Sequence, residues 1–93
     1  MERKRLTELE PVFVVTIPIH LEAGKLYVSE KYHTTAHLCP CGCGERVVMP
    51  TNDKYGWKLT NNDGRITMRP SVGNFEFACK SHYYITDNKI EWL

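Results

Sequence analysis

Hydrophobic and polar residues alternate along most of this chain, and no long stretch keeps the spacing of an amphipathic helix. Residues 12–19 (VFVVTIPI) show this most clearly, because every second residue from Phe13 to Ile19 is apolar and many side chains are β-branched. Both properties favour an extended backbone. The pattern predicts a first strand over residues 12–19, a turn at residues 22–24 and a second strand over residues 25–29.

The next segment, residues 30–36, fits two structures. Ser29 would cap a single helical turn, whereas the threonines within the segment favour an extended strand. The sequence leaves this segment open between the two. The sequence of residues 45–49 predicts a further strand, and Pro50 is expected to end it.

Two β-hairpins are the clearest local predictions. The arms 56–60 and 65–69 flank residues 61–64 (NNDG), whose residue types tolerate positive φ and favour a tight turn. A second hairpin over residues 82–92 turns at residues 87–88 (DN). The chain is therefore predicted to be mostly β.

The length and charge of the chain limit its class. A chain of 93 residues suffices for one domain with a modest core, and domains of this size commonly need a disulfide or a metal as a staple. We expect a single domain over residues 1–93, with residues 1–10 as a candidate flexible end. Its 12 basic and 11 acidic residues give a formal charge of +1, which lacks the broad positive field of a dedicated nucleic-acid-binding protein.

The distribution of apolar residues bears on location. No apolar run approaches the roughly 20 residues that span a bilayer. Charged residues fill the first positions, where the apolar part of a secretion signal would begin. We therefore expect a cytoplasmic protein with reduced thiols and without membrane or nucleic-acid partners.

Four cysteines are the strongest chemical signal: Cys39, Cys41 and Cys43 in the run CPCGCG, and Cys79 far downstream. Cysteines at C-x-C spacing are poorly placed for a disulfide with each other. Thiolates crowded onto a glycine-rich turn repel one another, and a bound cation removes that cost. Cys79 would complete the tetrahedral set that is typical of structural zinc. The predicted fold is a small twisted antiparallel sheet or open barrel around a four-cysteine zinc knuckle.

The cysteines allow two other interpretations. The thiols would simply be buried and reduced, or His82, in the C-x-x-H pair with Cys79, would replace one cysteine as the fourth ligand. A deaminase-type zinc centre is excluded, because its signature needs two residues between the paired cysteines and a nearby glutamate. Here a single residue separates Cys41 from Cys43.

The same cysteines belong to a series of blocks that runs through nearly the whole chain after its first ten residues. The blocks are LYVS at 26–29, HLCPCGCG at 37–44, PSVGN at 70–74, CKSHY at 79–83 and IEW at 90–92. Together they resemble a family of small bacterial proteins long classed as a domain of unknown function. Members of that family are encoded in bacterial ubiquitination-like (Bub) operons, beside ubiquitin-like proteins and relatives of ubiquitin-activating and -conjugating enzymes.

The resemblance implies a serine-type peptidase that trims or removes a ubiquitin-like modifier, with a serine nucleophile in a zinc-stabilised fold. The implied partners are the C-terminal tail of a ubiquitin-like protein and relatives of the activating and conjugating enzymes, and the implied setting includes antiviral defence. Without catalysis, the same features would suit a zinc-binding interaction module of a conjugation or defence system. A nucleic-acid-binding zinc knuckle is a third class, disfavoured by the balanced charge.

Serine chemistry needs a base within hydrogen-bond reach of the nucleophile. Ser71 is the leading nucleophile, because Gly73 allows close approach of a substrate and backbone N–H groups near it, or the Asn74 amide, would bind an oxyanion. His82 is the leading base, with a zinc ligand or a structural histidine as the other interpretations of that residue.

Alternatives remain for each member of this site. Ser81 is a second candidate nucleophile, although its side chain and that of the adjacent His82 would point to opposite faces of a strand. His37 is a candidate base or orienting residue, or a partner of a zinc-bound sulfur. The third member of a triad is open among three carboxylates, Glu30, Glu45 and Glu76.

Overall fold

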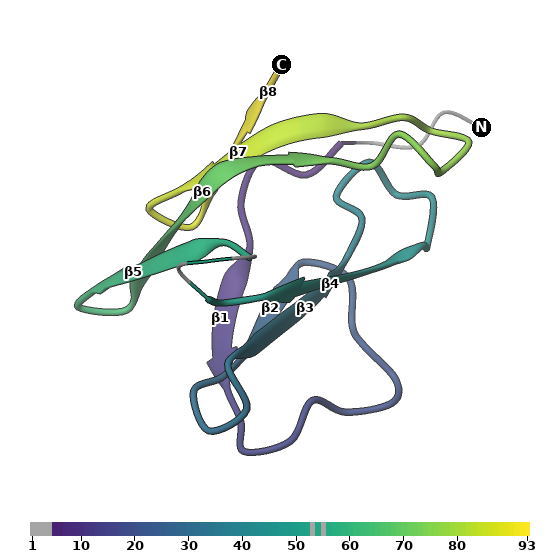
Figure 1. The fold of residues 1–93 in the computed structure, drawn as a ribbon. Helices are drawn as coiled ribbons and strands as arrows, with labels where there is room; N and C mark the ends of the chain where they lie inside the picture. Colours follow the sequence, from purple (N-terminus) through teal and green to yellow (C-terminus); the bar gives the residue numbers. More distant parts are fainter. Residues whose placement is uncertain (1–4, 53, 55) are drawn as a thin grey trace.

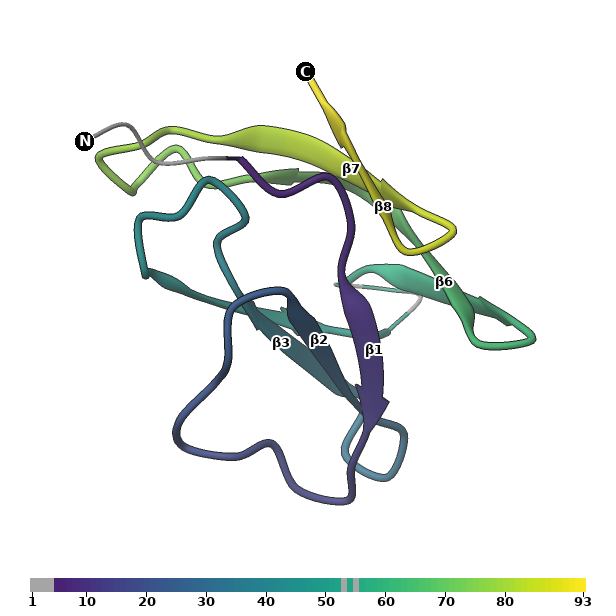
Figure 2. The ribbon, with the colours of Figure 1, turned by 180° about the vertical axis from the view of Figure 1, so that it is seen from behind.

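The computed structural model describes residues 5–52, 54 and 56–93 of the chain. Eight strands form two open, four-stranded sheets that lie on either side of one core (Figure 1; Figure 2). The predicted mostly β fold is confirmed, with two sheets in place of one. The described part of the chain contains no helix, and so no helix able to cross a membrane.

Each sheet is built from strands consecutive in the sequence. The first sheet has the order β1 (Glu10–Phe13), β2 (Lys25–Ser29), β3 (Thr34–Leu38) and β4 (Arg46–Pro50). The second has the order β5 (Lys58–Asn62), β6 (Arg65–Gly73), β7 (His82–Thr86) and β8 (Lys89–Trp92). All neighbouring strands are antiparallel except β1 and β2, which run parallel.

The core lies between the two sheets and follows the alternation of apolar residues. In β6, Ile66 and Met68 are both fully buried while Arg65 and Arg69 are exposed. The Thr35 hydroxyl of the first sheet lies 4.0 Å from the sulfur of Met68 in the second. Burial of each large apolar side chain stabilises the fold by about 1.5–3 kcal/mol.

Both predicted hairpins are present. The strands β7 and β8 have the predicted bounds, and the connecting residues Asp87 and Asn88 have φ of 48° and 68°. The hairpin of β5 and β6 turns through Asp63 and Gly64, again with positive φ. The segment 30–36 forms a turn that leads into β3, and the Ser29 hydroxyl accepts the Tyr32 N–H at 3.3 Å as a cap would.

The predicted strand over residues 12–19 is wrong beyond Phe13, where β1 ends. The apolar side chains that follow are largely exposed: Val15 is 63 % and Ile19 is 83 % exposed. The carbonyl groups of this segment are taken by side chains and not by a strand, since Ser29 donates to Val15 and Arg46 donates to Ile19 and Pro18. Alternation alone had predicted a strand, but β2 ends at Ser29 and offers no further backbone to pair with.

Candidate active site and metal centre

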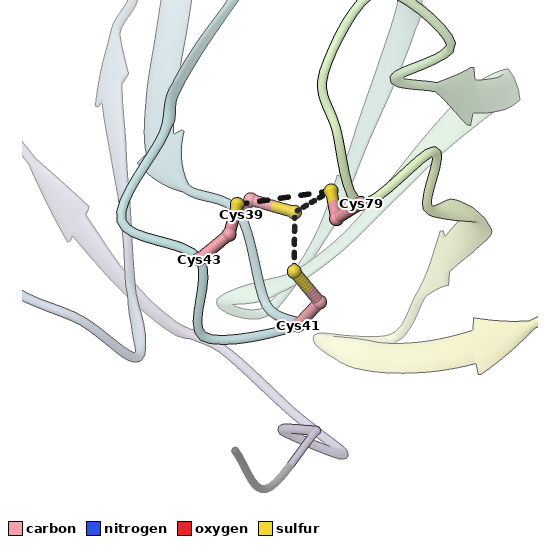
Figure 3. A group of neighbouring side chains, drawn as sticks. All are labelled: Cys39, Cys41, Cys43 and Cys79. Atoms are coloured by element: carbon pink, nitrogen blue, oxygen red, sulfur yellow. Dashed lines mark hydrogen bonds between the residues drawn. The ribbon is translucent and has the colours of Figure 1, made fainter. Parts of the chain in front are cut away.

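The four cysteine side chains point toward one another (Figure 3). Three come from the loop that follows β3, and Cys79 comes from the loop between β6 and β7. Their sulfur atoms all lie within 4.8 Å of one another, and none forms a disulfide.

The spacing of the sulfur atoms fits a metal ion. The separations are 3.5 Å for Cys39–Cys41, 3.8 Å for Cys39–Cys79 and 3.7 Å for Cys43–Cys79. Four bonds of about 2.3 Å in a tetrahedral zinc site place the sulfurs about 3.8 Å apart. The cluster therefore has the donor set and the dimensions of a closed, tetrahedral thiolate site.

The backbone of the loop curls around the point where the ion would lie. Gly42 and Gly44 have φ of 91° and 84°, in the left-handed region that favours glycine. The Cys39 N–H donates to the Glu45 carbonyl at 2.8 Å, and the Gly42 N–H donates to the Cys39 carbonyl at 3.1 Å. These bonds bring the ends of the loop together and turn its cysteines inward.

Proton equilibria differ between the thiols of the cluster. Burial, with hydrogen bonds from the neighbouring thiols, raises the pKa of Cys41 to about 12. Burial also opposes ionisation of Cys79, but hydrogen bonds from Ser81 and from the neighbouring thiols outweigh it and lower the pKa of Cys79 to about 6. The protein alone thus favours a thiolate at Cys79 beside a thiol that resists ionisation, whereas a bound divalent metal stabilises its cysteine ligands as thiolates.

Two polar residues buried beside the sulfurs join the cluster to strands β6 and β7. The Ser81 hydroxyl lies 3.0 Å from Cys39 Sγ and 3.5 Å from Cys79 Sγ. The Asn74 amide donates to the Ser81 hydroxyl at 3.1 Å, and the Asn74 backbone N–H donates to the Ser81 carbonyl at 2.8 Å. The Asn74 side chain, a sequence-predicted oxyanion donor, is therefore directed into the cluster.

The structure brings Ser71 and His82 together on the other face of these strands. The distance between Ser71 Oγ and His82 Nε2 is 2.8 Å, and both side chains are half-buried. His82 pairs with Gly73 across the β6–β7 ladder, so Ser71, two residues before Gly73, is its diagonal neighbour on the same face. The register of β6 against β7 shifts between Met68 and Val72, directly before this contact.

His82 faces Ser71 and not the cysteines. Among the described residues, the group able to hold a metal consists of the four cysteines alone. The His82 ring also lies against the ring of Phe75, with centroids 5.2 Å apart and an angle of 61° between the planes.

No carboxylate pairs with His82 in the described part of the chain. The single ion pair of these residues joins Lys25 to Glu22. The three carboxylates named from the sequence, Glu30, Glu45 and Glu76, are all exposed. Among the described residues, the geometry is a serine–histidine pair without a charged third member.

His37 lies apart from this pair, in the core on β3. Its Nε2 atom is 2.7 Å from the hydroxyl of the buried Tyr83. Burial lowers the pKa of His37 to about 4, so this imidazole is neutral at physiological pH. The structure thus places His37 with Tyr83, in a hydrogen bond that does not involve Ser71 or His82.

A groove of about 480 Å³ lies along the end of β6, where Val72 and Gly73 line it; Ser71 and His82 themselves are not among its lining residues. One wall is the edge of β6 with Phe75, and the other includes Arg46, Val47 and Val48 of β4. Trp57 lines the groove and donates its indole N–H to the Ser71 carbonyl at 3.3 Å.

The edge of β6 is open along this groove. β5 pairs with β6 only as far as Arg69, so among the described strands residues 71–73 have a neighbour on the β7 side alone. The sequence singled out neither Trp57 nor Phe75. The proximity of Phe75 to the PSVGN block was the one available signal for its place in the site.

Comparison with known proteins agrees with this geometry. No curated protein and no solved structure matches the chain significantly. A family model described as "Bacterial ubiquitination-like system serine protease (BubE)" matches residues 13–93, which include all four cysteines, Ser71 and His82. The chain therefore belongs to the family of serine proteases of bacterial ubiquitination-like systems.

Proposed function

We propose that this protein hydrolyses the peptide chain at the C-terminal tail of a bacterial ubiquitin-like protein, with Ser71 as the nucleophile and His82 as the general base. The 2.8 Å contact between Ser71 Oγ and His82 Nε2 carries the assignment, because it is the geometry in which a histidine accepts the proton of an attacking serine. Membership in a serine protease family supplies the class of reaction.

The reaction follows from this contact. As Ser71 Oγ forms a bond to the carbonyl carbon of the scissile peptide, its proton passes to His82 Nε2. The resulting imidazolium gives that proton to the leaving amine as the C–N bond breaks, which leaves an ester on Ser71. Water then hydrolyses the ester along the same proton route and restores the serine.

The open edge of β6 offers a donor for the oxyanion. The backbone N–H of Asn74 points toward β7, where it donates to the backbone carbonyl of Ser81. Because consecutive N–H groups of a strand point to opposite sides, the Gly73 N–H points into the groove. We propose this N–H as a donor to the carbonyl oxygen that becomes negative during attack.

The groove along the edge of β6 suits an extended peptide. Its β6 edge has backbone groups without a strand partner on that side, and its walls carry the apolar side chains of Val48, Trp57 and Phe75. An extended chain laid along such an edge gains backbone hydrogen bonds while its side chains contact the walls. The flexible tail of a ubiquitin-like protein is a substrate of this form.

We further propose that the cysteine cluster binds structural Zn²⁺. Four thiolates would close the coordination sphere and leave no position for a reactive water, so the ion would act by holding the loops together. Because Asn74 and Ser81 contact the cluster and adjoin Gly73 and His82, the ion would fix the ends of both strands that carry the reactive pair.

A cleavage assay tests the proposal. The protein is incubated with a ubiquitin-like protein from a Bub operon that carries a C-terminal extension, and the products are identified by mass spectrometry. Cleavage within the tail by the wild-type protein, its loss in Ser71→Ala, and labelling of Ser71 by a fluorophosphonate would support the assignment. Tight binding without cleavage, or unchanged cleavage by Ser71→Ala, would contradict it.

A further inference from the structure

The histidine of a serine–histidine pair must be held in one orientation, and a carboxylate at Nδ1 usually does this. The described residues place no carboxylate against His82. What they do place there is the Phe75 ring, whose centroid is 5.2 Å from that of the imidazole.

Phe75 is a large apolar residue, yet 62 % of its surface is exposed. It adds little to the core, so burial does not explain its position. Its ring instead lies along the same face of β6 as Gly73, directly beside His82.

Gly73 makes room for that ring. A Cβ atom at Gly73 would lie 2.4 Å from Phe75 Cε2, closer than real Cβ atoms approach, and 3.0 Å and 3.1 Å from Cδ2 and Cζ. Gly73 does not belong to the glycines with positive φ, so a larger side chain at this position would displace the Phe75 ring without straining the backbone. Because Gly73 pairs with His82 across the ladder, the ring that covers Gly73 necessarily meets the imidazole.

We infer that Phe75 is a positioning residue: its ring, seated on Gly73, holds the His82 imidazole toward Ser71 in place of a carboxylate. The inference rests on the proposed function of the Ser71–His82 pair. An aromatic edge-to-face contact restricts rotation of the imidazole without adding a charge next to it.

The rate of fluorophosphonate inactivation measures the reactivity of Ser71 without a peptide in the groove, so it separates positioning of His82 from substrate binding. Phe75→Ala should lower this rate by about tenfold to a hundredfold, the scale on which misplacement of a reacting group acts. Phe75→Tyr keeps the ring and should recover most of the rate. With a tail peptide as substrate, Phe75→Ala should reduce kcat more than it raises KM.

Gly73→Ala tests the same inference independently, because its methyl group would displace the Phe75 ring. It should lose as much reactivity as Phe75→Ala, and the double variant Gly73→Ala/Phe75→Ala should be no less reactive than either single variant. Metal content and thermal midpoint, measured for every variant, show that the fold is retained.

Failure of the function and failure of the inference give distinct results. A wild-type protein that does not react with the fluorophosphonate at Ser71 would overturn the proposed function and, with it, this inference. A reactive wild-type protein with an equally reactive Phe75→Ala variant, or with an effect on KM alone, would overturn the inference and leave the proposed function standing. Losses that multiply in the double variant would also overturn it, because they would show that the two residues act separately.

Discussion

Ser81 and His82 are consecutive residues whose side chains belong to two different sites. Ser81 lies 3.0 Å from Cys39 in the cysteine cluster, and His82 lies 2.8 Å from Ser71 on the opposite face of the sheet. This follows from the alternation of side chains along a strand. A single backbone segment thereby joins the cluster that holds the fold to the pair that we propose performs the chemistry.

Substitution by alanine should affect a different property at each of the two serines. Ser71→Ala should lower kcat for tail cleavage by about a thousandfold or more while leaving metal affinity unchanged. Ser81→Ala removes a hydroxyl from beside the sulfurs and should weaken metal affinity by about tenfold to a hundredfold. Competition with a chromogenic chelator and kinetics on the metal-loaded proteins measure both effects. A Ser81→Ala variant that loses activity at full metal occupancy would contradict this separation.

His82→Gln should abolish cleavage and keep the metal. The side chain is directed at Ser71, and the described candidate ligands are the four cysteines, so one ion per chain is expected in the variant by elemental analysis. Removal of a general base typically costs about 10²–10⁴ in rate. Loss of the ion on this substitution would instead identify His82 as a ligand.

Cys79→Ser should release the metal and destabilise the domain. Of the four cysteines, Cys79 is the one that lies between strands of the second sheet. Its loss therefore removes the link between the loop that joins β6 to β7 and the loop after β3. The thermal midpoint should fall by at least about 10 °C, because a domain of this size shifts by about 4–8 °C per kcal/mol. A chelator should lower the midpoint of the wild-type protein and leave that of Cys79→Ser unchanged. A wild-type midpoint insensitive to metal removal would show that the ion is not structural.

Trp57→Phe tests the hydrogen bond to the Ser71 carbonyl while keeping an aromatic ring in the groove. Loss of one such bond typically costs about 0.5–1.5 kcal/mol, so kcat/KM should fall by about twofold to tenfold. Trp92→Phe is a matched control, because it removes an indole N–H that donates to Leu6 at 3.0 Å, outside the groove lining. Equal effects of both variants on kcat/KM would argue against a role of Trp57 in the site.

Met49→Ala and Ile19→Ala compare a core position with a position that sequence alternation wrongly assigned to a strand. Met49 is fully buried, and its truncation should lower the free energy of unfolding by about 2–5 kcal/mol. Ile19 is 83 % exposed, and its truncation should change that energy by less than about 0.5 kcal/mol. Denaturant titration of the metal-loaded proteins measures both. A large loss in Ile19→Ala would mean that residues 14–19 pack more closely than the structure describes.

Local chemistry determined a large part of this protein. Period-two alternation and turn residues placed the strands β2, β7 and β8 at their observed bounds, because both act between near neighbours in the chain. The spacing of the cysteines likewise predicted their cluster, since three of the four lie in one short loop.

Contacts between distant segments set which strands find partners and which side chains meet. Alternation in residues 12–19 predicted a strand throughout, but a strand needs a neighbour, and β2 offers none beyond Ser29. The sequence kept Ser71 and Ser81 as alternatives and left His82 between base and ligand. The register of β6 on β7 directed Ser71 to His82 and Ser81 to the cysteines. Such register depends on hydrogen bonds between distant segments, which a local pattern does not contain.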